Sequence, residues 1–412
     1  MFSALMRFMT GQTQNSSYWL EVPLLKGRAE IPSEASIVII GSGLSGVSAG
    51  YFLQKEGFEN ILIVDYKPEQ AATFRNCGHI LYGTVESMKA FSEIHGIEKA
   101  RELWGLSIEL CHQVKETINT LGIDADYKQD GYLVIAVSEA EDRECRESVK
   151  LLNSMGFQSD YWDASVVKSK GFKNVFGGRF EKGSAQAHPV KFRNGVLREF
   201  LNQGGSYSEA KVLRLKESAD GVVITTAAGE IKCEAAVIAA NAYAPLFSDF
   251  FKNKRLIEPF RGQIITSRPL KTHFPVRFPH SFDHGYEYSL MTQDNRLMIG
   301  GWRNHSESRE VGTYSLETNG MITEGLKDFA LNHYEIPEKI EWEYSWSGIM
   351  GASQTSLPFI GPTNSDRIFS CAGYTGHGFS WAHGSAKLLA KIMAGSDVPE
   401  VARHFSPKQI LV

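Results

Sequence analysis

The sequence predicts an α/β fold made of a discontinuous Rossmann-like domain and a second domain built on a mostly antiparallel sheet. Three features of the sequence predict it. A strand, glycine turn, helix and strand follow one another near the N-terminus; a buried strand leads into Ala-Asn-Ala-Tyr in the middle; and a glycine-rich turn precedes an apolar helix near the C-terminus. Between the last two, apolar and polar residues alternate at period two, which is typical of antiparallel strands with one covered face.

The N-terminal unit has the spacing of a dinucleotide-binding βαβ motif. An apolar run ends at Ile40, the turn reads Gly-Ser-Gly-Leu-Ser-Gly, and a second apolar run ends at Asp65. The three glycines permit a tight turn, close approach of the backbone to a pyrophosphate and close packing of helix on strand, while the helix N-terminus favours phosphate. Asp65 lies about 20 residues beyond the glycines, where a carboxylate can hold ribose hydroxyls. We expect cofactor contacts from Gly41, Ser42, Gly43, Leu44, Ser45, Gly46, Asp65 and Tyr66.

Composition excludes several other classes of protein. The chain has 412 residues, 42% of them hydrophobic, and a net charge of −4, so we expect a small substrate, no nucleic-acid partner and no membrane span. The five cysteines show no CxxC spacing, so no metal site or disulfide framework is expected, and a reducing cytoplasm fits. Met1 to Thr10 is too short for a membrane span and lacks a signal-peptide pattern, so we expect it to pack on the surface or move freely.

The remaining elements follow from periodicity and from glycine and proline positions. A long helical pattern runs from about Ala90 to Leu121, and an amphipathic helix is expected from Glu139 to Met155. Pro189 begins another helix, and Phe379 to Ala394 form an apolar one. Strands are expected at residues 131–137, 208–214, 222–226, 235–240, 263–266, 286–290, 296–300 and 368–372.

Seven short motifs, in this order, carry a resemblance to a known family. They are Gly41–Gly46, Arg75-Asn76 with Gly78, Ala240–Tyr243, Arg261–Gln263, Trp346–Gly351, Pro358–Gly361 and Gly373–Phe379. With these motifs the chain resembles the D-amino-acid oxidase superfamily of FAD-dependent oxidoreductases, specifically its glycine oxidase, sarcosine oxidase and γ-glutamylputrescine oxidase branches. The resemblance covers about residues 37–394.

The resemblance implies bound FAD, with the flavin ring between the two domains. The implied FAD-binding domain comprises residues 35–90, 183–255 and 345–400; the substrate domain comprises residues 91–182 and 256–344; and residues 1–34 and 401–412 are terminal extensions. Helix dipoles at the turn before the last helix would stabilise charge on the reduced flavin. Further implied cofactor contacts are Arg75, Asn76, Cys77, Gly78, His79, Asn241, Trp346, Gly348, Gly373, Gly376, His377, Gly378 and Phe379.

The resemblance also implies hydride transfer from the α-carbon of a neutral amine to flavin N5, giving an imine that water hydrolyses. Candidate residues around the amine are Tyr286, Glu287, Tyr288, Trp302, Trp346 and His377. For His377 we favour a structural role of the backbone turn over a catalytic imidazole. Glu287 could bind a cationic amine, or it could point to the opposite side of the strand from both tyrosines.

Three departures limit this resemblance. Ser380 stands where sarcosine oxidases have a lysine that helps to bind the substrate carboxylate. The Trp346–Gly351 segment has no arginine, whereas D-amino-acid oxidases have one there for the same carboxylate, so an α-amino-acid substrate is less expected. Arg75 and Arg303 remain as candidates for binding an anion. Met298 stands where sarcosine oxidases have a lysine near the flavin, at the place where oxygen reacts. Reaction with oxygen is therefore expected to be slow, and another electron acceptor is an alternative. No cysteine lies near Trp346–Ile349 for covalent attachment of the flavin; Cys77 and His79 are the side chains placed to contact or bond it.

We therefore predict a FAD-dependent amine or amino-acid oxidase or dehydrogenase that is cytoplasmic. Its partners would be a small primary or secondary amine, such as an amino acid, an N-methyl amine or a polyamine derivative, and oxygen or another acceptor. Two alternatives remain open at this point: a flavoprotein that acts on a macromolecule, as in tRNA modification, and an assembly factor that keeps FAD without turnover.

Overall fold

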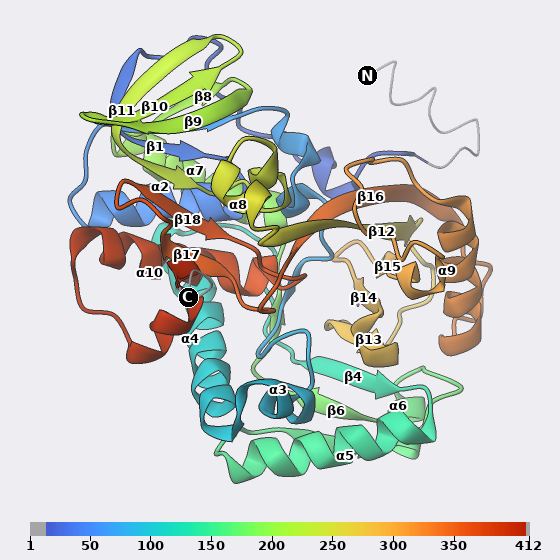
Figure 1. Ribbon diagram of the computed structural model, residues 1–412. Coiled ribbons are helices and arrows are strands. Elements are labelled where there is room, and N and C mark those ends of the chain that lie inside the picture. Colours follow the sequence, from blue (N-terminus) through green and yellow to red (C-terminus); the bar gives the residue numbers. More distant parts are fainter. Residues whose placement is uncertain (1–13, 409–412) are drawn as a thin grey trace, which may run out of the picture.

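Residues 14–408 are described by the computed structural model, which contains two large sheets (Figure 1). The first sheet has the strand order β17-β18-β11-β1-β2-β8, and β9 and β10 extend it from β11. Its strands are β1 (Glu34–Ile40), β2 (Ile61–Asp65), β8 (Ser206–Glu209), β9 (Val212–Ser218), β10 (Gly221–Thr226), β11 (Gly229–Ile238), β17 (Phe359–Pro362) and β18 (Ile368–Ala372).

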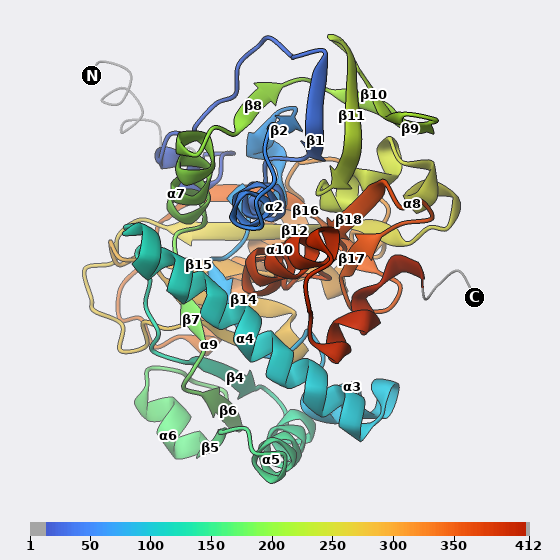
Figure 2. The same ribbon diagram turned by 90° about the vertical axis from the view of Figure 1, so that its left-hand side faces the viewer.

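The centre of the first sheet is parallel. β11, β1, β2 and β8 run parallel to one another, and β18 runs parallel to β11. Its central strands are apolar on both faces, because helices cover one face and the β9–β10 hairpin with its apolar neighbours covers the other. Figure 2 shows α2 (Leu44–Lys55), α4 (Ile97–Leu121), α7 (Pro189–Asn202) and α10 (Gly378–Ala394) on the helical side.

A buried histidine joins three of these helices. His383 of α10 is fully buried; its Nδ1 lies 2.7 Å from Ser48 Oγ of α2 and its Nε2 lies 2.8 Å from Thr117 Oγ1 of α4. Burial lowers the pKa of His383 to about 3, so the ring is neutral. A neutral imidazole that uses both nitrogens fixes the spacing of the three helices without an unpaired polar atom.

The second sheet has the order β16-β12-β15-β14-β13-β4-β6-β5, and every pair except β4–β13 is antiparallel. One face packs against α9 (Gly320–His333) and α6 (Ala164–Ser169) through an apolar cluster. Its strands are β4 (Tyr132–Ala136), β5 (Asp160–Asp163), β6 (Gly177–Glu181), β12 (Ile257–Ser267), β13 (His280–Phe282), β14 (Glu287–Met291), β15 (Leu297–Gly300) and β16 (Trp342–Ser353).

Smaller elements complete the described part of the chain. They are β3 (His79–Ile80) and β7 (Ala185–Gln186), which pair with each other; α3 (Met88–His95), α5 (Glu139–Ser154) and α8 (Asp249–Asn253); and short 3-10 helices at Tyr18–Glu21, Pro68–Gln70, Ala72–Phe74, Asn241–Leu246, Asp283–Gly285, Arg303–His305 and Glu400–Phe405. No helix within residues 14–408 is long and apolar enough to cross a bilayer.

The predicted fold class is confirmed, and two details differ from the prediction. The single helix expected from Ala90 to Leu121 is two helices, because Gly96 between them adopts φ +81°, a left-handed conformation that ends α3. The expected boundary at residue 345 falls inside β16, all of which pairs within the second sheet. The other domain boundaries stay a prediction, and the behaviour predicted for Met1 to Thr10 lies outside the described residues.

The close packing of α2 on β1 gives a test of the fold. A Cβ at Gly46 would lie 1.8 Å from the carbonyl oxygen of Gly41, so Gly46→Ala must push the helix away from the turn. We expect a lower melting temperature by circular dichroism and a protein purified with less bound cofactor. Gly105→Ala in α4 is the matched control, because its nearest neighbour is 3.9 Å away and alanine favours the helix by up to about 1 kcal/mol. Equal stability of both variants would contradict this account.

Candidate functional site

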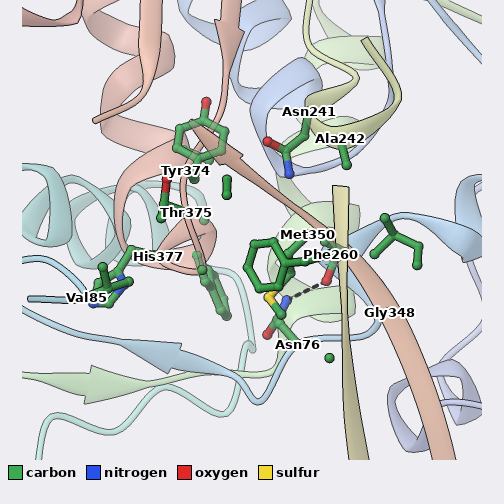
Figure 3. Close-up of a pocket in the computed structure, with 18 of the residues that line it drawn as sticks. Asn76, Val85, Asn241, Ala242, Phe260, Gly348, Met350, Tyr374, Thr375 and His377 are labelled. Atoms are coloured by element: carbon green, nitrogen blue, oxygen red, sulfur yellow. Dashed lines mark hydrogen bonds between the residues drawn. The ribbon is translucent and has the colours of Figure 1, made fainter. Parts of the chain in front are cut away.

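One cavity of about 910 Å³ runs between the two sheets. It begins at the glycine turn after β1, passes the turn before α10 and ends at the face of the second sheet that α9 does not cover. Figure 3 shows its middle, where Tyr374, Thr375 and His377 lie on one side and Phe260, Gly348 and Met350 of the second sheet lie on the other. Both sheets are therefore needed to form the cavity.

The first end of the cavity is organised by Asp65, the last residue of β2. One carboxylate oxygen accepts hydrogen bonds from the backbone N–H of Ser42 and from its hydroxyl, both at 2.7 Å, and the other accepts from the N–H of Tyr66 at 2.6 Å. Arg193 of α7 donates to Ser42 from the buried side, to the carbonyl oxygen at 2.9 Å and to Oγ at 3.0 Å. These bonds fix the glycine turn between β1 and β2.

Two helix N-termini open onto the cavity. The N-caps of α2 and α10 are Gly43 and His377, and neither makes a side-chain capping bond. Thr73 Oγ1 accepts from the N–H of Leu44 at 2.9 Å. Uncapped N–H groups and the positive ends of two helix dipoles suit an anionic or electron-accepting ligand.

The segment after Phe74 forms the wall between these helices. Asn76 donates to the carbonyl oxygens of Ala72 and Thr73 and accepts from the N–H of Gly78 at 2.7 Å, so its amide holds the turn. Arg75 donates to the carbonyl oxygen of Ser347 at 2.7 Å, which joins this wall to β16. Burial lowers the pKa of Arg75.

Two cavity histidines are neutral. His79 Nε2 donates to the carbonyl oxygen of Ser289 at 3.0 Å, which leaves Nδ1 as the acceptor. Burial lowers the pKa of His79 to about 3 and that of His377 to about 4. Burial also raises the pKa of Cys77, so the thiol stays protonated and is a poor nucleophile. This part of the cavity therefore carries no imidazolium or thiolate charge.

Tyrosines line the wall of the second sheet. Tyr286 and Tyr288 line the cavity, as does Tyr132, whose hydroxyl lies 2.5 Å from Ser281 Oγ. Arg303 lies over the rings of Phe260 and Tyr286, at 4.8 and 5.2 Å from their centroids. Burial raises the pKa of Tyr132 to about 12, so its hydroxyl is neutral. The wall thus offers neutral hydroxyls beside aromatic surface.

The structure places most of the predicted site residues on the cavity, and a minority away from it. The predicted residues that line the cavity are Gly41, Gly43, Leu44, Ser45, Asp65, Tyr66, Arg75, Asn76, Cys77, His79, Asn241, Tyr286, Tyr288, Gly348, Gly376, His377, Gly378 and Phe379. The predicted residues that do not line it are Ser42, Gly46, Gly78, Glu287, Trp302, Trp346 and Gly373.

Both predicted tryptophans have structural contacts instead. Trp346 is buried, and its indole N–H donates to the carbonyl oxygen of Arg75 at 3.1 Å. Trp302 packs against the face of the second sheet that lies away from the cavity.

Glu287 points away from both neighbouring tyrosines. It is 1% exposed, on the face of β14 opposite the cavity; its Oε1 accepts from the N–H of Trp302 at 3.2 Å, and its Oε2 has no hydrogen-bond partner among the described residues. Burial, and next the charge of Asp283, raises the pKa of Glu287 to about 8. The carboxyl is therefore protonated at neutral pH and does not face an amine in the cavity.

Sequence patterns did not identify the far end of the cavity. That end is lined by Tyr132, Val134, Glu141, Glu144, Cys145, Arg179 and Ser281, which come from β4, α5, β6 and β13. The alternation in residues 131–137 could have placed Tyr132 and Val134 on one face of a strand. It could not show that this face adjoins a cavity, because the neighbouring strands come from distant parts of the chain.

Comparison with known families decides the class of protein. The family model described as "FAD dependent oxidoreductase", of the D-amino-acid oxidase (DAO) type, matches residues 36–392. The chain belongs to this family.

Individual DAO-family relatives are distant. The chain is 24% identical to the probable oxidoreductase OrdL of Haemophilus influenzae, over 88% of this chain and 84% of the relative. It is 22% identical to γ-glutamylputrescine oxidoreductase of Escherichia coli, over 87% and 83%. The solved structure of glycine oxidase from Geobacillus kaustophilus superimposes with a TM-score of 0.76 at 19% identity, over 91% of this chain and 98% of that one, which shows a shared fold.

FAD is the cofactor of this DAO-family oxidoreductase, and the cavity fits it. The cavity extends from the N-terminus of α2 to that of α10. The glycine turn has no room for a side chain at Gly41, because a Cβ there would lie 2.7 Å from the carbonyl oxygen of Ala239. Asp65 and the α2 N-terminus would hold the nucleotide end, and the α10 N-terminus and His79 the flavin end.

The orientation of Glu287 gives a prediction about stability. Because the pKa of this carboxyl rises from 4.5 in the unfolded chain to about 8, the folded protein loses stability as pH rises through that range. Glu287→Gln keeps the acceptor for Trp302 N–H and removes the titration. We expect the variant to melt a few degrees higher than the parent near pH 8 and at the same temperature near pH 4.5, with unchanged flavin reduction. A lower melting temperature at pH 8 would contradict this assignment.

Proposed function

We propose that the protein oxidises the C–N bond of a small primary or secondary amine to an imine. The observation that carries this proposal is the continuity of the cavity: it extends from the FAD-binding turns to a wall of tyrosines on the second sheet, so a substrate carbon can lie next to the cofactor. The names of relatives such as glycine oxidase and γ-glutamylputrescine oxidoreductase support an amine or amino acid as substrate.

The electrostatic character of the wall supports a neutral amine. His79, His377 and the tyrosine hydroxyls are uncharged at neutral pH. Neutral imidazoles and phenols, together with the Arg303 guanidinium that also lines this wall, disfavour an ammonium and favour the free base, which has the lone pair that assists loss of hydride from the adjacent carbon. FAD, when bound, supplies the hydride acceptor.

The protein's own residues would orient the amine. We assign Tyr288 and Tyr132 to the wall beside the substrate, and His79 Nδ1 to accepting a hydrogen bond from it, because Nε2 is committed to Ser289. Arg303, whose guanidinium lies over the rings of Phe260 and Tyr286, is the candidate to bind a carboxylate of the substrate. Product imine would leave the cavity and hydrolyse in water.

An anaerobic panel of amines tests the reaction. The purified holoenzyme is mixed with sarcosine, glycine, D-amino acids, putrescine and γ-glutamylputrescine, and the visible absorbance of oxidised flavin is followed. We expect bleaching by at least one class, and Tyr288→Phe should slow it while leaving the flavin content unchanged. On admission of air, fast recovery of the absorbance identifies an oxidase, and slow recovery identifies a dehydrogenase with another acceptor.

The control is chemical reduction by dithionite. If dithionite bleaches the flavin and no amine does, the proposed reaction is wrong, and a macromolecular substrate or a role without turnover replaces it.

A second prediction concerns the attachment of the cofactor. Because the thiol of Cys77 is protonated and His79 is held by Ser289, we expect FAD to be bound without a covalent link. Mass spectrometry of the acid-denatured holoenzyme should give the unmodified chain mass and free FAD. A chain heavier by one FAD would contradict the prediction, and the Cys77→Ser and His79→Gln variants would then locate the bond.

A further inference from the structure

Two turns meet at one edge of the second sheet. β13, β14 and β15 lie side by side, and β14 is antiparallel to both neighbours, so the end of β13, the start of β14 and the end of β15 share this edge (Figure 1). Residues 283–286 join β13 to β14, and residues 301–305 follow β15. The two turns pack closely, because a Cβ at Gly301 would lie 1.9 Å from the carbonyl oxygen of Tyr286. Polar side chains of both turns are therefore brought together.

Three of these side chains present metal-ligating atoms to one another. One carboxylate oxygen of Asp283, one of Glu287 and one ring nitrogen of His305 all lie within 4.8 Å of one another. Ligands about 2.1 Å from a zinc ion stand about 3.4 Å apart in a tetrahedral site, so side-chain shifts of about 1 Å bring all three atoms to one cation.

The carboxyl of Glu287 has an oxygen that needs a partner. The side chain is 1% exposed; Oε1 accepts from the N–H of Trp302 at 3.2 Å, and Oε2 has no hydrogen-bond partner among residues 14–408. Burial first, and then the charges of Asp283 and Glu141, raise the pKa of this carboxyl to about 8. A bound cation would supply the missing partner and offset the repulsion between the carboxylates.

The other two ligating side chains are held in place. Asn304 Nδ2 donates to Asp283 Oδ2 at 2.9 Å, which orients that carboxylate. The imidazole of His305 stacks on the indole of Trp302, with 4.0 Å between ring centroids and 23° between planes, and no residue within 14–408 forms a hydrogen bond with its ring nitrogens. Contacts of this kind fix the orientation of metal ligands. His305 is exposed, so a cation reaches it from solvent without passing through the cavity.

A neighbouring group of side chains is less suited to a cation. Glu141, Asp283 and His284 also bring ligating atoms within 4.8 Å of one another. Both oxygens of Glu141, however, already accept hydrogen bonds, from Ser138 Oγ and from the N–H of Val137. His284 Nδ1 lies 3.4 Å from a carboxylate of α5. A cation in this group would have to displace those contacts.

We propose that Asp283, Glu287 and His305 form a binding site for one divalent cation of the zinc type. An imidazole with two carboxylates suits Zn²⁺, whereas Mg²⁺ and Ca²⁺ favour oxygen ligands alone. Glu287 gives up its proton to solvent when the cation binds. The site contains no cysteine, so cysteine spacing could not indicate it. It lies outside the cavity and does not depend on the proposed oxidation of an amine.

The cation has a structural role in this arrangement. Tyr286 precedes the ligand Glu287, and Arg303 lies two residues before the ligand His305; both Tyr286 and Arg303 line the cavity. A cation bound by Asp283, Glu287 and His305 therefore joins the two turns that carry this part of the cavity wall.

Metal binding by the holoenzyme tests the site without turnover. Untagged protein is treated with EDTA, desalted and titrated with zinc chloride by calorimetry, and the metal retained per chain is counted by plasma mass spectrometry. We expect one Zn²⁺ per chain, and a melting temperature at least about 3 °C higher with free zinc at a hundredfold excess over its Kd. Mg²⁺ should bind at least about tenfold more weakly than Zn²⁺.

His305→Gln is the principal variant, because its side chain is exposed and the substitution leaves the core unchanged. It should weaken zinc binding by about tenfold or more, as should Asp283→Asn and Glu287→Gln. His284→Gln removes an imidazole from the adjoining position and is the matched control, expected to bind zinc as the parent does. In EDTA, His305→Gln should melt with the parent. Because zinc keeps Glu287 ionised, the pH dependence of melting in Glu287→Gln is compared with the parent in EDTA.

Four results would overturn the proposal. The first is a parent protein that retains no zinc, and the second is equal zinc affinity in His305→Gln and the parent. The third is Mg²⁺ that binds as tightly as Zn²⁺, because a site with an imidazole ligand prefers zinc. The fourth is a loss in His284→Gln as large as that in His305→Gln, which would move the cation to the group that contains Glu141.

Discussion

The site depends on the hydrogen bonds between the Asp65 carboxylate and Ser42, both 2.7 Å long. They hold the glycine turn after β1 against the end of β2, and Arg193 fixes the same serine from α7. Arg193 is fully buried, and its donors are occupied by Ser42, Leu25 and Asn194, so the buried guanidinium is hydrogen-bonded. Because this network lies directly under the glycine turn, loss of any member would shift the start of α2 and the cofactor end of the cavity.

Several of the contacts that join the second sheet to this nucleotide-binding part lie at the middle of the cavity. Arg75 donates to the carbonyl oxygen of Ser347, Trp346 donates to the carbonyl oxygen of Arg75, and a Cβ at Gly348 would lie 2.8 Å from the Cβ of Arg75. Trp346, which sequence motifs suggested as a substrate wall, instead fixes the distance between the two sheets. That distance sets the space left for the flavin ring and for the substrate beside it.

The polar groups of the cavity fall into two parts with different electrostatics. Beside the turn before α10, imidazoles and phenols are neutral because burial shifts their pKa values away from neutrality. Farther along the sheet, Arg179, Glu141 and Glu144 bring formal charges of both signs. Arg303 adds a guanidinium beside Phe260 and Tyr286. Three strand spacings of the second sheet separate the backbone of Tyr288 from that of Arg179 by about 14 Å.

The fold class, the family and the FAD end of the site could all be predicted from the amino-acid order alone. Glycine spacing, strand patterns and short motifs are local, and they act through backbone geometry that Gly41, Gly43 and Asp65 specify within one βαβ unit. The lining of the cavity on the second sheet, in contrast, depends on how distant segments pack together. Period-two alternation gives two faces to β14, but burial against α9 decided that Glu287 lies behind the sheet and Tyr288 on the cavity. Arg179 and Glu144 border the same cavity as Tyr288 because β6 and α5 pack beside β4, and β4 pairs with β13, which lies more than a hundred residues farther along the chain, a pairing that no local pattern encodes.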